Sequence, residues 1–164
     1  GPAERGGNGD SGSGCLESPV HALRLIEAVG ASVDLPVTLK TRRGWDNESL
    51  NAASVARRAQ EAGSQMVTIH GRTRCQFYKG TADWEAIREI KQAVSIPVLA
   101  NGDIVDQETA RIALEHSGAD GVMIGRGIQG KPWMLAQVAN DIWDSKAPKV
   151  PEGSDFTAMV STVP

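Results

Sequence analysis

Four short apolar runs, each rich in β-branched residues, recur along the chain. They are PVTLK (Pro36–Lys40), MVTIH (Met66–His70), PVLAN (Pro97–Asn101) and GVMIG (Gly121–Gly125). A run that is apolar on both faces is typical of a parallel strand buried between two layers. The pattern therefore predicts four strands of one parallel sheet.

Amphipathic stretches alternate with these runs and predict five helices. The predicted helices are Pro19–Val29, Ser49–Ala62, Asp83–Ala93, Asp106–His116 and Lys131–Trp143. Asp83 and Asp106 are typical N-caps, and Pro132 is tolerated in a first turn. Gly63 is a suitable left-handed C-cap, and Gly118 follows the fourth helix. Strands alternating with helices indicate βαβ units, and hence the α/β class.

Two parallel-sheet architectures compete, an open doubly wound sheet and a barrel. A doubly wound dinucleotide-binding sheet needs GxGxxG after its first strand, whereas the first run here is followed by TRRGWD. Polar residues stand instead at the carboxyl ends of the runs, where (βα) barrels place their chemistry. A closed barrel needs eight strands, so four runs predict a partial TIM (βα) barrel.

The composition of the 164-residue chain, 40% of it hydrophobic, suffices for one domain core. We expect residues 1–16 to be a glycine-rich loop or tail, residues 17–146 to form the barrel part, and residues 147–164 to be a linker or tail. The polar, glycine-rich start is not a secretory signal, and no apolar run approaches the roughly 18 residues needed to span a membrane.

Charge and cysteine content narrow the function classes. The net charge is −3, so the chain as a whole lacks a basic field for gripping nucleic acid, although a local basic patch is compatible with it. Cys15 and Cys75 lie far apart without CxxC spacing. That argues against a zinc site or a disulfide framework and suits the reducing cytoplasm.

The first two predicted strands end on basic residues. Lys40 ends the first, and a cation there suits an anionic ligand such as the N1/O2 edge of a reduced flavin. His70 ends the second and is a candidate flavin or substrate contact. A solvated strand-end lysine and a hydrogen-bonded structural histidine explain the same residues equally well.

The last two predicted strands are followed by glycine-containing triplets. The NGD triplet consists of Asn101, Gly102 and Asp103, and its glycine lets the backbone approach a ligand closely. A simple turn is the alternative. In the GRG triplet, Gly125 and Arg126 combine open backbone with a guanidinium, which is typical of a phosphate site. The last two strands of a barrel often hold such a site.

The loop that follows the second strand, GRTRCQFYKG, combines cations with aromatic residues. Such a combination can hold single-stranded RNA through phosphate pairing and base stacking. The candidate RNA- or substrate-binding residues are Arg72, Arg74 and Lys79. An exposed loop whose aromatic residues pack against the next helix remains an alternative.

Taken together, these motifs resemble the tRNA-dihydrouridine synthase family, in its bacterial DusB branch. The resemblance covers about residues 10–143 and rests on PVTLKTRRGWD, HGRTRCQFYKG with ADW, NGDI and GRG. It implies a non-covalent FMN, reduced by NADPH, and reduction of uridine in tRNA to 5,6-dihydrouridine. It also implies FMN contacts at positions matching Lys40, His70, the NGD triplet, Gly125 and Arg126.

The resemblance further implies parts that the sequence lacks. The family's proton-donating cysteine falls on Gly1, and Cys15 is a poor substitute, so no catalytic residue is assigned. The first four strands and the C-terminal tRNA-binding helical domain are also missing. We therefore expect residues 17–146 to be the C-terminal half of an FMN-binding barrel, nearly inactive by itself.

Two other classes of function stay open. One is a non-catalytic remnant that binds a phosphate-bearing ligand or RNA, or that self-associates through unpaired sheet edges. The other is a different phosphate-binding barrel enzyme, such as a sugar-phosphate isomerase, although its catalytic carboxylate or lysine pair is not visible.

Overall fold

The computed structural model describes residues 19–145, in which strands and helices alternate. The strands are β1 (Thr38–Arg42), β2 (Met66–His70), β3 (Val98–Asn101) and β4 (Gly121–Met123). Neighbouring strands pair in parallel, and the order β1-β2-β3-β4 repeats the order of the chain. The predicted α/β class with a parallel sheet is confirmed. The interpretations of Gly1, Cys15 and residues 147–164 lie outside the described residues.

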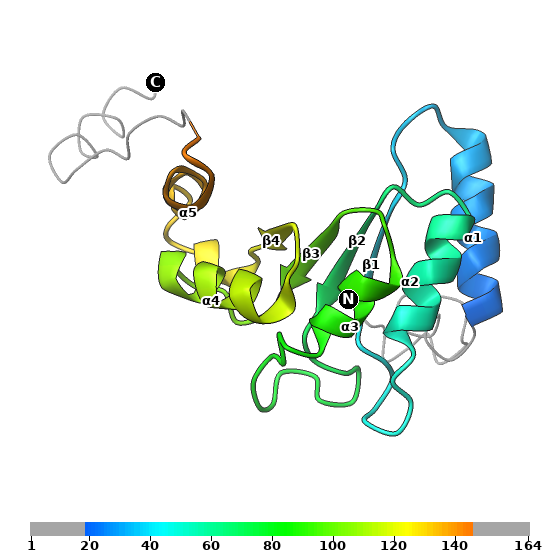
Figure 1. Cartoon of the computed structure of the whole chain (residues 1–164), viewed down its shortest axis with the longest axis horizontal. Helices are drawn as coiled ribbons and strands as arrows, with labels where there is room; N and C mark the ends of the chain where they lie inside the picture. Colours follow the sequence, from blue (N-terminus) through cyan, green and yellow to red (C-terminus); the bar gives the residue numbers. More distant parts are fainter. Residues whose placement is uncertain (1–18, 146–164) are drawn as a thin grey trace, which may run out of the picture.

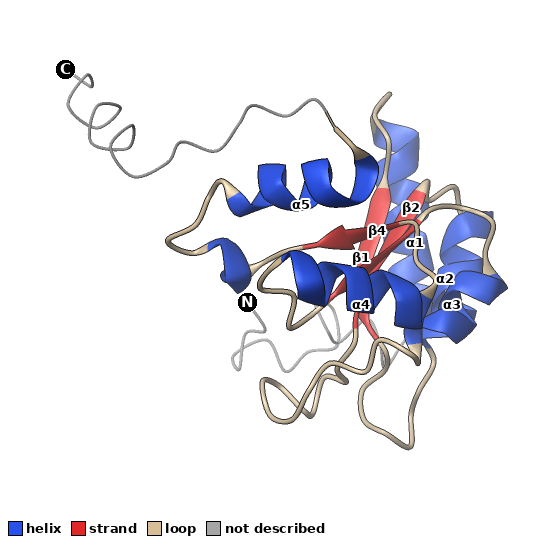
Figure 2. Ribbon diagram, turned by 60° about the vertical axis from the view of Figure 1, so that its left-hand side comes forward, coloured by secondary structure: helices blue, strands red, loops and turns tan. Residues whose placement is uncertain are grey.

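The helices are α1 (Pro19–Ser32), α2 (Ala52–Glu61), α3 (Ile87–Ala93), α4 (Gln107–Ser117) and α5 (Met134–Trp143), with a short 3-10 helix, η2 (Arg126–Ile128), after β4. Helices α2, α3 and α4 lie beside this sheet, and α1 and α5 lie at the two ends of the row of helices (Figures 1 and 2). Helix α2 packs against α1 and α3, and α4 packs against α5. Within the described residues no helix is both long and apolar enough to cross a bilayer.

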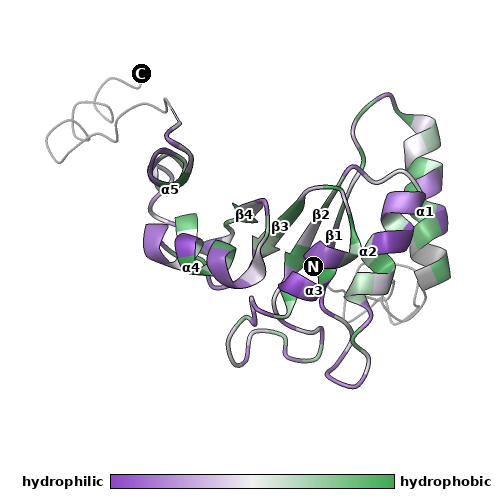
Figure 3. Ribbon diagram, in the orientation of Figure 1, coloured by the Kyte–Doolittle hydropathy of each residue, from purple (hydrophilic) through white to green (hydrophobic). Residues whose placement is uncertain are grey.

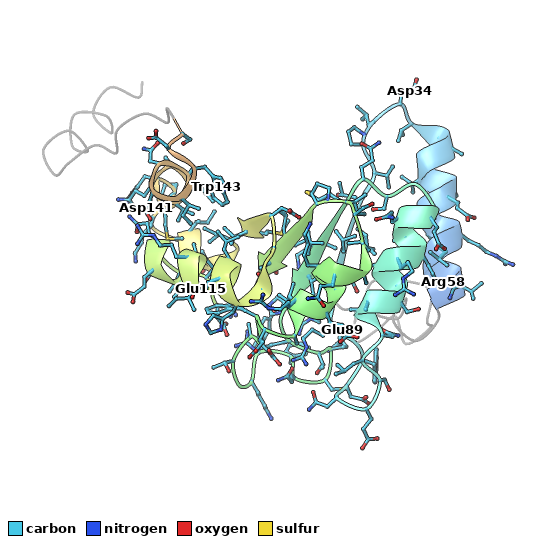
Figure 4. The ribbon with its side chains drawn as sticks, viewed as in Figure 1. Asp34, Arg58, Glu89, Glu115, Asp141 and Trp143 are labelled. Atoms are coloured by element: carbon cyan, nitrogen blue, oxygen red, sulfur yellow. The ribbon has the colours of Figure 1, made fainter. Side chains whose placement is uncertain are left out.

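One face of the sheet forms the core with α2 and α3. Successive side chains of a strand alternate between faces, and the register pairs the buried residues Val67 and Ile69 of β2 with Val98 and Ala100 of β3. These four pack with Ala52, Ala56, Ile87 and Ile90 from the two helices. Figure 3 shows the apolar character of β3, and Figure 4 shows charged residues such as Glu89 and Glu115 on the outer surface.

The opposite face of the sheet carries Lys40, Thr68 and Leu99, which lie side by side in the register. In a closed barrel this face lines the interior. Towards the carboxyl ends of the strands, successive side chains continue to alternate between the two faces. The register of the strands therefore decides which polar side chains meet at the carboxyl edge of the sheet.

Strand β2 matches its predicted bounds, whereas β1 and β3 begin later than predicted, at Thr38 and Val98, and the ends of β1 and β4 also differ. Strand β1 continues to Arg42, which pairs with His70, so the prediction that Lys40 ends this strand is wrong. Thr41 and Arg42 are polar, so the apolar pattern did not extend the predicted strand to them. They belong to β1 because their backbone pairs with β2. Strand β4 stops at Met123, because the backbone turns at Gly125 (φ −106°, ψ −109°) into η2.

Three helices begin later than predicted. Helix α2 starts at Ala52 and not at Ser49, because Gly44 and Leu50 form an antiparallel bridge that holds the preceding residues in a loop. Asp83 does not begin α3, but its Oδ1 accepts a hydrogen bond from the Ala86 amide (2.9 Å) and caps the turn before that helix. Pro132 lies outside α5, which starts at Met134.

The ends of α2 and α4 lie within one residue of those predicted, and the predicted capping roles of Asp106, Gly118 and Gly63 agree with the backbone. Asp106 caps α4 in a reciprocal capping box with Thr109, and Gly118 at its C-cap has a φ of 64°. Gly63, which directly follows the C-cap of α2, has a φ of 94°. In this left-handed region glycine avoids the strain that a Cβ atom would cause.

Candidate functional site

A pocket of about 500 Å³ lies at the carboxyl ends of β2, β3 and β4. Parallel strands bring these ends to a single edge, so residues far apart in sequence meet there. Six of the seven predicted cofactor-binding residues line the pocket, namely His70, Asn101, Gly102, Asp103, Gly125 and Arg126. The geometry thus gathers the polar strand ends that the sequence singled out.

Lys40 is the one predicted cofactor-binding residue that does not line this pocket. Lys40 lies inside β1, two residues before the last residue of the strand, and its neighbour in β2 is Thr68. The side chain is exposed. Partial loss of surrounding water and the nearby charge of Arg42 both lower the pKa of Lys40 from its usual value.

His70 enters the pocket as a neutral imidazole. Desolvation, followed by the positive charges of Arg42, Lys40 and Arg72, lowers its pKa to about 4. Its Nδ1 accepts a hydrogen bond from the Arg72 amide (3.2 Å), so the ring proton of the neutral form lies on Nε2. His70 is therefore a hydrogen-bond donor that carries no charge near pH 7.

The NGD triplet forms a tight turn that faces the pocket. Asn101 is buried and donates from Nδ2 to the Met123 carbonyl (2.7 Å), whereas its Oδ1 accepts no hydrogen bond from residues 19–145. At Gly102 the φ is 109°, and an added Cβ would lie 2.9 Å from the Ala82 Cβ and 3.1 Å from Cε1 of His70. The turn therefore needs glycine, and the Asn101 oxygen remains available to a ligand.

Arg72 fastens the loop after β2 to the NGD turn. It is only 4% exposed and donates from Nη1 and Nη2 to the two carboxylate oxygens of Asp103, each at 2.8 Å. It also donates to the carbonyls of Lys79 (3.1 Å) and Gly80 (2.6 Å). These contacts use the guanidinium of Arg72 inside the protein, and its burial leaves almost none of the side chain accessible to RNA.

Asp103 is held by the same contacts. Desolvation raises the pKa of Asp103, but hydrogen bonds from Arg72 and from the Ala82 amide, with the charge of Arg72, outweigh it and leave the pKa below its usual value. Its backbone φ of 55° lies in the left-handed region. Asp103 lines the pocket while its carboxylate remains ionised and engaged by Arg72.

The loop of residues 71–80 rests on a second arginine that sequence reasoning did not single out. Arg42, the last residue of β1, donates from Nη1 to the carbonyls of Thr73 (2.7 Å) and Phe77 (3.0 Å). Its place directly after Lys40 and Thr41 was the only signal in the sequence. Figure 1 shows this loop beside the loop after β1, to which the Arg74 amide is hydrogen-bonded.

The two remaining candidates for RNA contact lie on the surface of this loop. The Arg74 guanidinium stands 5.0 Å from the ring of Phe77 and 5.9 Å from that of Trp45. Lys79 is exposed and makes no ion pair with the described residues. Lys79 is therefore accessible to a polyanion, and Arg74, although half-buried, makes no ion pair with the described residues, in contrast to Arg72.

Arg126 closes the pocket on the side of β4. The side chain is exposed and its guanidinium carbon lies 4.5 Å from the ring centre of Tyr78. No carboxylate among residues 19–145 forms an ion pair with it. A side chain at Gly127 would strike the Ile104 carbonyl oxygen, so this glycine lets η2 lie against the turn after β3, while the space in front of Gly125 is open.

Six further residues line the pocket, and of these only Gly127 belonged to a triplet predicted to bind a ligand, the GRG triplet. They are Tyr78, Ile104, Val105, Met123, Gly127 and Gln129. Most are apolar or small and carry no motif of their own, since only the fold brings them to the pocket. Tyr78 had a signal, an aromatic residue beside cations, but the loop sequence alone did not connect it to the GRG triplet.

Comparison with known proteins places these motifs in a wider context. A family model described as Dihydrouridine synthase (Dus) matches residues 1–163. A probable tRNA-dihydrouridine synthase of Rhodobacter capsulatus is 58% identical over 160 residues, which are 98% of this chain and 49% of that protein. The tRNA-dihydrouridine synthase B of Vibrio vulnificus is 46% identical over 137 residues, 84% of this chain and 42% of that protein. The chain thus spans about half the length of these relatives.

A solved structure supports the architecture. Phosphonopyruvate hydrolase, in a crystal structure of its complex with oxalate and Mg²⁺, superposes with a TM-score of 0.56 at 22% identity and covers 77% of this chain and 48% of that one. At this level of identity the similarity concerns the fold alone. With the parallel sheet, it identifies the described residues as part of a TIM barrel, as predicted.

Proposed function

Since the chain belongs to the dihydrouridine synthase family, we propose that it supplies the flavin-holding half of a tRNA-dihydrouridine synthase. In the proposed reaction a uridine of tRNA is reduced to 5,6-dihydrouridine, with NADPH as the reductant. FMN, when bound, would supply the hydride-transfer chemistry. The observation that carries the proposal is the single pocket into which the strand-end motifs of β2, β3 and β4 converge. Because tRNA is the proposed substrate, we also propose that the protein acts in the cytoplasm.

The polar groups of the pocket suit a phosphorylated flavin. Arg126 has no carboxylate partner within residues 19–145, and the backbone at Gly125 is open, so this side suits the phosphate. The neutral His70 offers a donor and Asn101 offers the acceptor Oδ1, as the mixed polar edge of a flavin ring requires. Gly102 permits close approach of the backbone. The site therefore fits the cofactor that the family resemblance implies.

Lys40 and Asp103 take more limited roles in this proposal. We assign Lys40 to the flavin on the resemblance alone, because it lies on the sheet face and not in the pocket lining. Asp103 would act mainly through Arg72, which occupies both of its oxygens. The division of the chain stays as the sequence suggested, with residues 17–146 as the C-terminal half of the barrel.

A binding experiment tests the flavin assignment. We expect the 164-residue chain to bind FMN more tightly than riboflavin, which lacks the phosphate. Replacement Arg126→Ala should lower FMN affinity by about tenfold to a hundredfold, because a charge-assisted hydrogen bond contributes about 1.5–3 kcal/mol. The matched control is Arg57→Ala, on the outer surface of α2. Quenching of flavin fluorescence measures the affinities of the unaltered chain and both variants, and equal binding of the two flavins by the unaltered chain would refute the phosphate site.

We also propose that Arg74 and Lys79 bind phosphates of the tRNA. Removing one cation that pairs with a phosphate should make the dependence of log K on log salt shallower by about 0.7–0.9. Arg74→Ala and Lys79→Ala should therefore each weaken binding of an unmodified tRNA transcript, with the largest effect at low salt. Fluorescence anisotropy over a salt series gives the slopes, and slopes that match that of Arg57→Ala would exclude this surface.

A further inference from the structure

A series of contacts crosses the carboxyl edge of the sheet from β1 to the turn after β4. At one end, Arg42 holds the carbonyl of Phe77 at 3.0 Å. The ring of Phe77 meets the ring of Tyr78 edge to face, with 4.9 Å between the ring centres. At the other end, Tyr78 lies under the guanidinium of Arg126 at 4.5 Å. The loop after β2 thereby reaches the far side of the pocket.

Tyr78 is the one contact among the described residues that fixes the direction of the Arg126 guanidinium. Arg126 is exposed and stands between two glycines, so neither its own backbone surroundings nor an ion pair restrains its long side chain. Ordering such a side chain at the moment of binding costs conformational entropy. Stacking on an aromatic ring reduces that cost, because a guanidinium can lie flat on the ring and keep its N–H groups free at the edge.

We propose that Tyr78 is a positioning residue that holds Arg126 over the pocket for the phosphate group of the bound ligand. The inference rests on the proposed function, since it presumes a phosphate at Arg126. Both side chains line the same pocket. Tyr78 is 56% exposed, and burial is therefore not what places it there. Its ring acts on the phosphate through Arg126, and so its loss should affect only phosphate-bearing ligands.

The comparison of FMN with riboflavin separates this role from a general structural one. At an exposed site a cation–π contact contributes about 0.5–1 kcal/mol, so Tyr78→Ala should lower FMN affinity by about two- to fivefold. Affinity for riboflavin should stay the same. Tyr78→Phe keeps the ring and should restore the preference for FMN. Tyr78→Leu keeps apolar bulk without an aromatic face and should behave like Tyr78→Ala.

Two further variants complete the test. In the double variant Tyr78→Ala with Arg126→Ala, the preference for FMN should equal that of Arg126→Ala alone, because Tyr78 acts only through the guanidinium. Cys75→Ser changes an exposed side chain in the same loop and should leave both affinities unchanged. Titrations followed by flavin fluorescence, with circular dichroism to verify folding, supply the readouts.

The outcomes distinguish the two levels of the proposal. If the unaltered chain binds FMN and riboflavin equally, the phosphate site itself fails and the positioning role falls with it. If Arg126→Ala abolishes the preference for FMN but Tyr78→Ala and Tyr78→Leu retain it, only the positioning role is refuted. An equal loss of FMN and riboflavin affinity in Tyr78→Ala also refutes it, because the ring would then contact the flavin directly.

Discussion

Single side chains in this pocket differ in what the sequence could reveal of them. His70, Asn101 and Arg126 stand at strand ends, so their convergence follows from parallel pairing and was predictable. Arg72 was not, because the sequence offers three cations in one loop and gives no sign of which folds inward. Its inward turn depends on Asp103, thirty-one residues further along the chain, which only the tertiary structure brings near. Ion pairs between residues far apart in the sequence thus decide which arginine is buried in the protein and which stays near the surface.

The neutral state of His70 has a measurable consequence. Its pKa of about 4 lies below the usual 6.5, so the folded state stays unprotonated where the unfolded chain already binds a proton. The stability contributed by His70 is therefore fully present above pH 6.5 and is lost as the pH falls from 6.5 to 4. The imidazole resonance, assigned by comparison with His70→Gln, should titrate in NMR with a midpoint near 4. A midpoint near the usual value would contradict this environment.

The pair of Arg72 and Asp103 should contribute more to stability than a surface pair. The Arg72 side chain is 5% exposed and that of Asp103 is 32% exposed, so Asp103→Asn, which leaves the buried guanidinium without its charge partner, should lower the free energy of unfolding by about 1.5–3 kcal/mol. Arg111→Ala breaks a pair whose side chains are 58% and 29% exposed and should cost about 0.5 kcal/mol. Urea denaturation of both variants tests the contrast. Equal losses would show that the inner pair does no more than an exposed one.

Secondary-structure elements were predictable where local chemistry defines them. Strand β2 matches its apolar run, and Asp106 caps α4 because a short acidic side chain satisfies the free amides of a first turn. The boundaries that failed depend on partners elsewhere in the chain. Strand β1 continues through polar residues because β2 offers hydrogen bonds, and α2 starts late because Leu50 is bridged to Gly44. The periodicity of apolar residues does not indicate which distant segment a residue pairs with, so it could not predict these boundaries.

Two glycines in or beside helices should respond in opposite ways to alanine. Gly118 ends α4 with a φ of 64°, so Gly118→Ala should destabilise the protein by about 1 kcal/mol. Gly30 lies within α1, where an added Cβ would meet no atom within 4 Å, and Gly30→Ala should stabilise by about 0.5–1 kcal/mol. Thermal unfolding of both variants measures the difference. A stabilised Gly118→Ala variant would contradict the left-handed C-cap.

At the scale of the whole molecule, the described residues leave two sheet edges unpaired and several large apolar side chains exposed. Within residues 19–145, β1 pairs only with β2 and β4 only with β3, so each outer strand keeps a free edge. Val20, Leu25 and Val29 of α1 are exposed, and Trp143 of α5, labelled in Figure 4, is 48% exposed. The number of strands and their parallel pairing were predicted from the apolar runs and the helices between them. What covers these edges did not, because the sequence specifies a strand without specifying its outer neighbour.

We expect the chain to self-associate through the free edge of β1 and through exposed apolar residues of α1. The mean sedimentation coefficient should rise with concentration. Val29→Lys introduces a charge on the exposed face of α1 and should reduce the rise, whereas Glu89→Lys on the outer surface of α3 should not. A single monomeric species at every concentration, with cooperative melting, would rule this association out.

The agreement between sheet order and chain order bears on how the molecule is made. Each strand finds its neighbour in the segment synthesised just before it, so no earlier strand must move aside to admit a later one. During synthesis on the ribosome, each new strand can pair with the free edge of the strand that precedes it in the sequence. Each pairing spans about one strand–helix unit of the chain, which favours stepwise growth of the sheet from the N-terminal side.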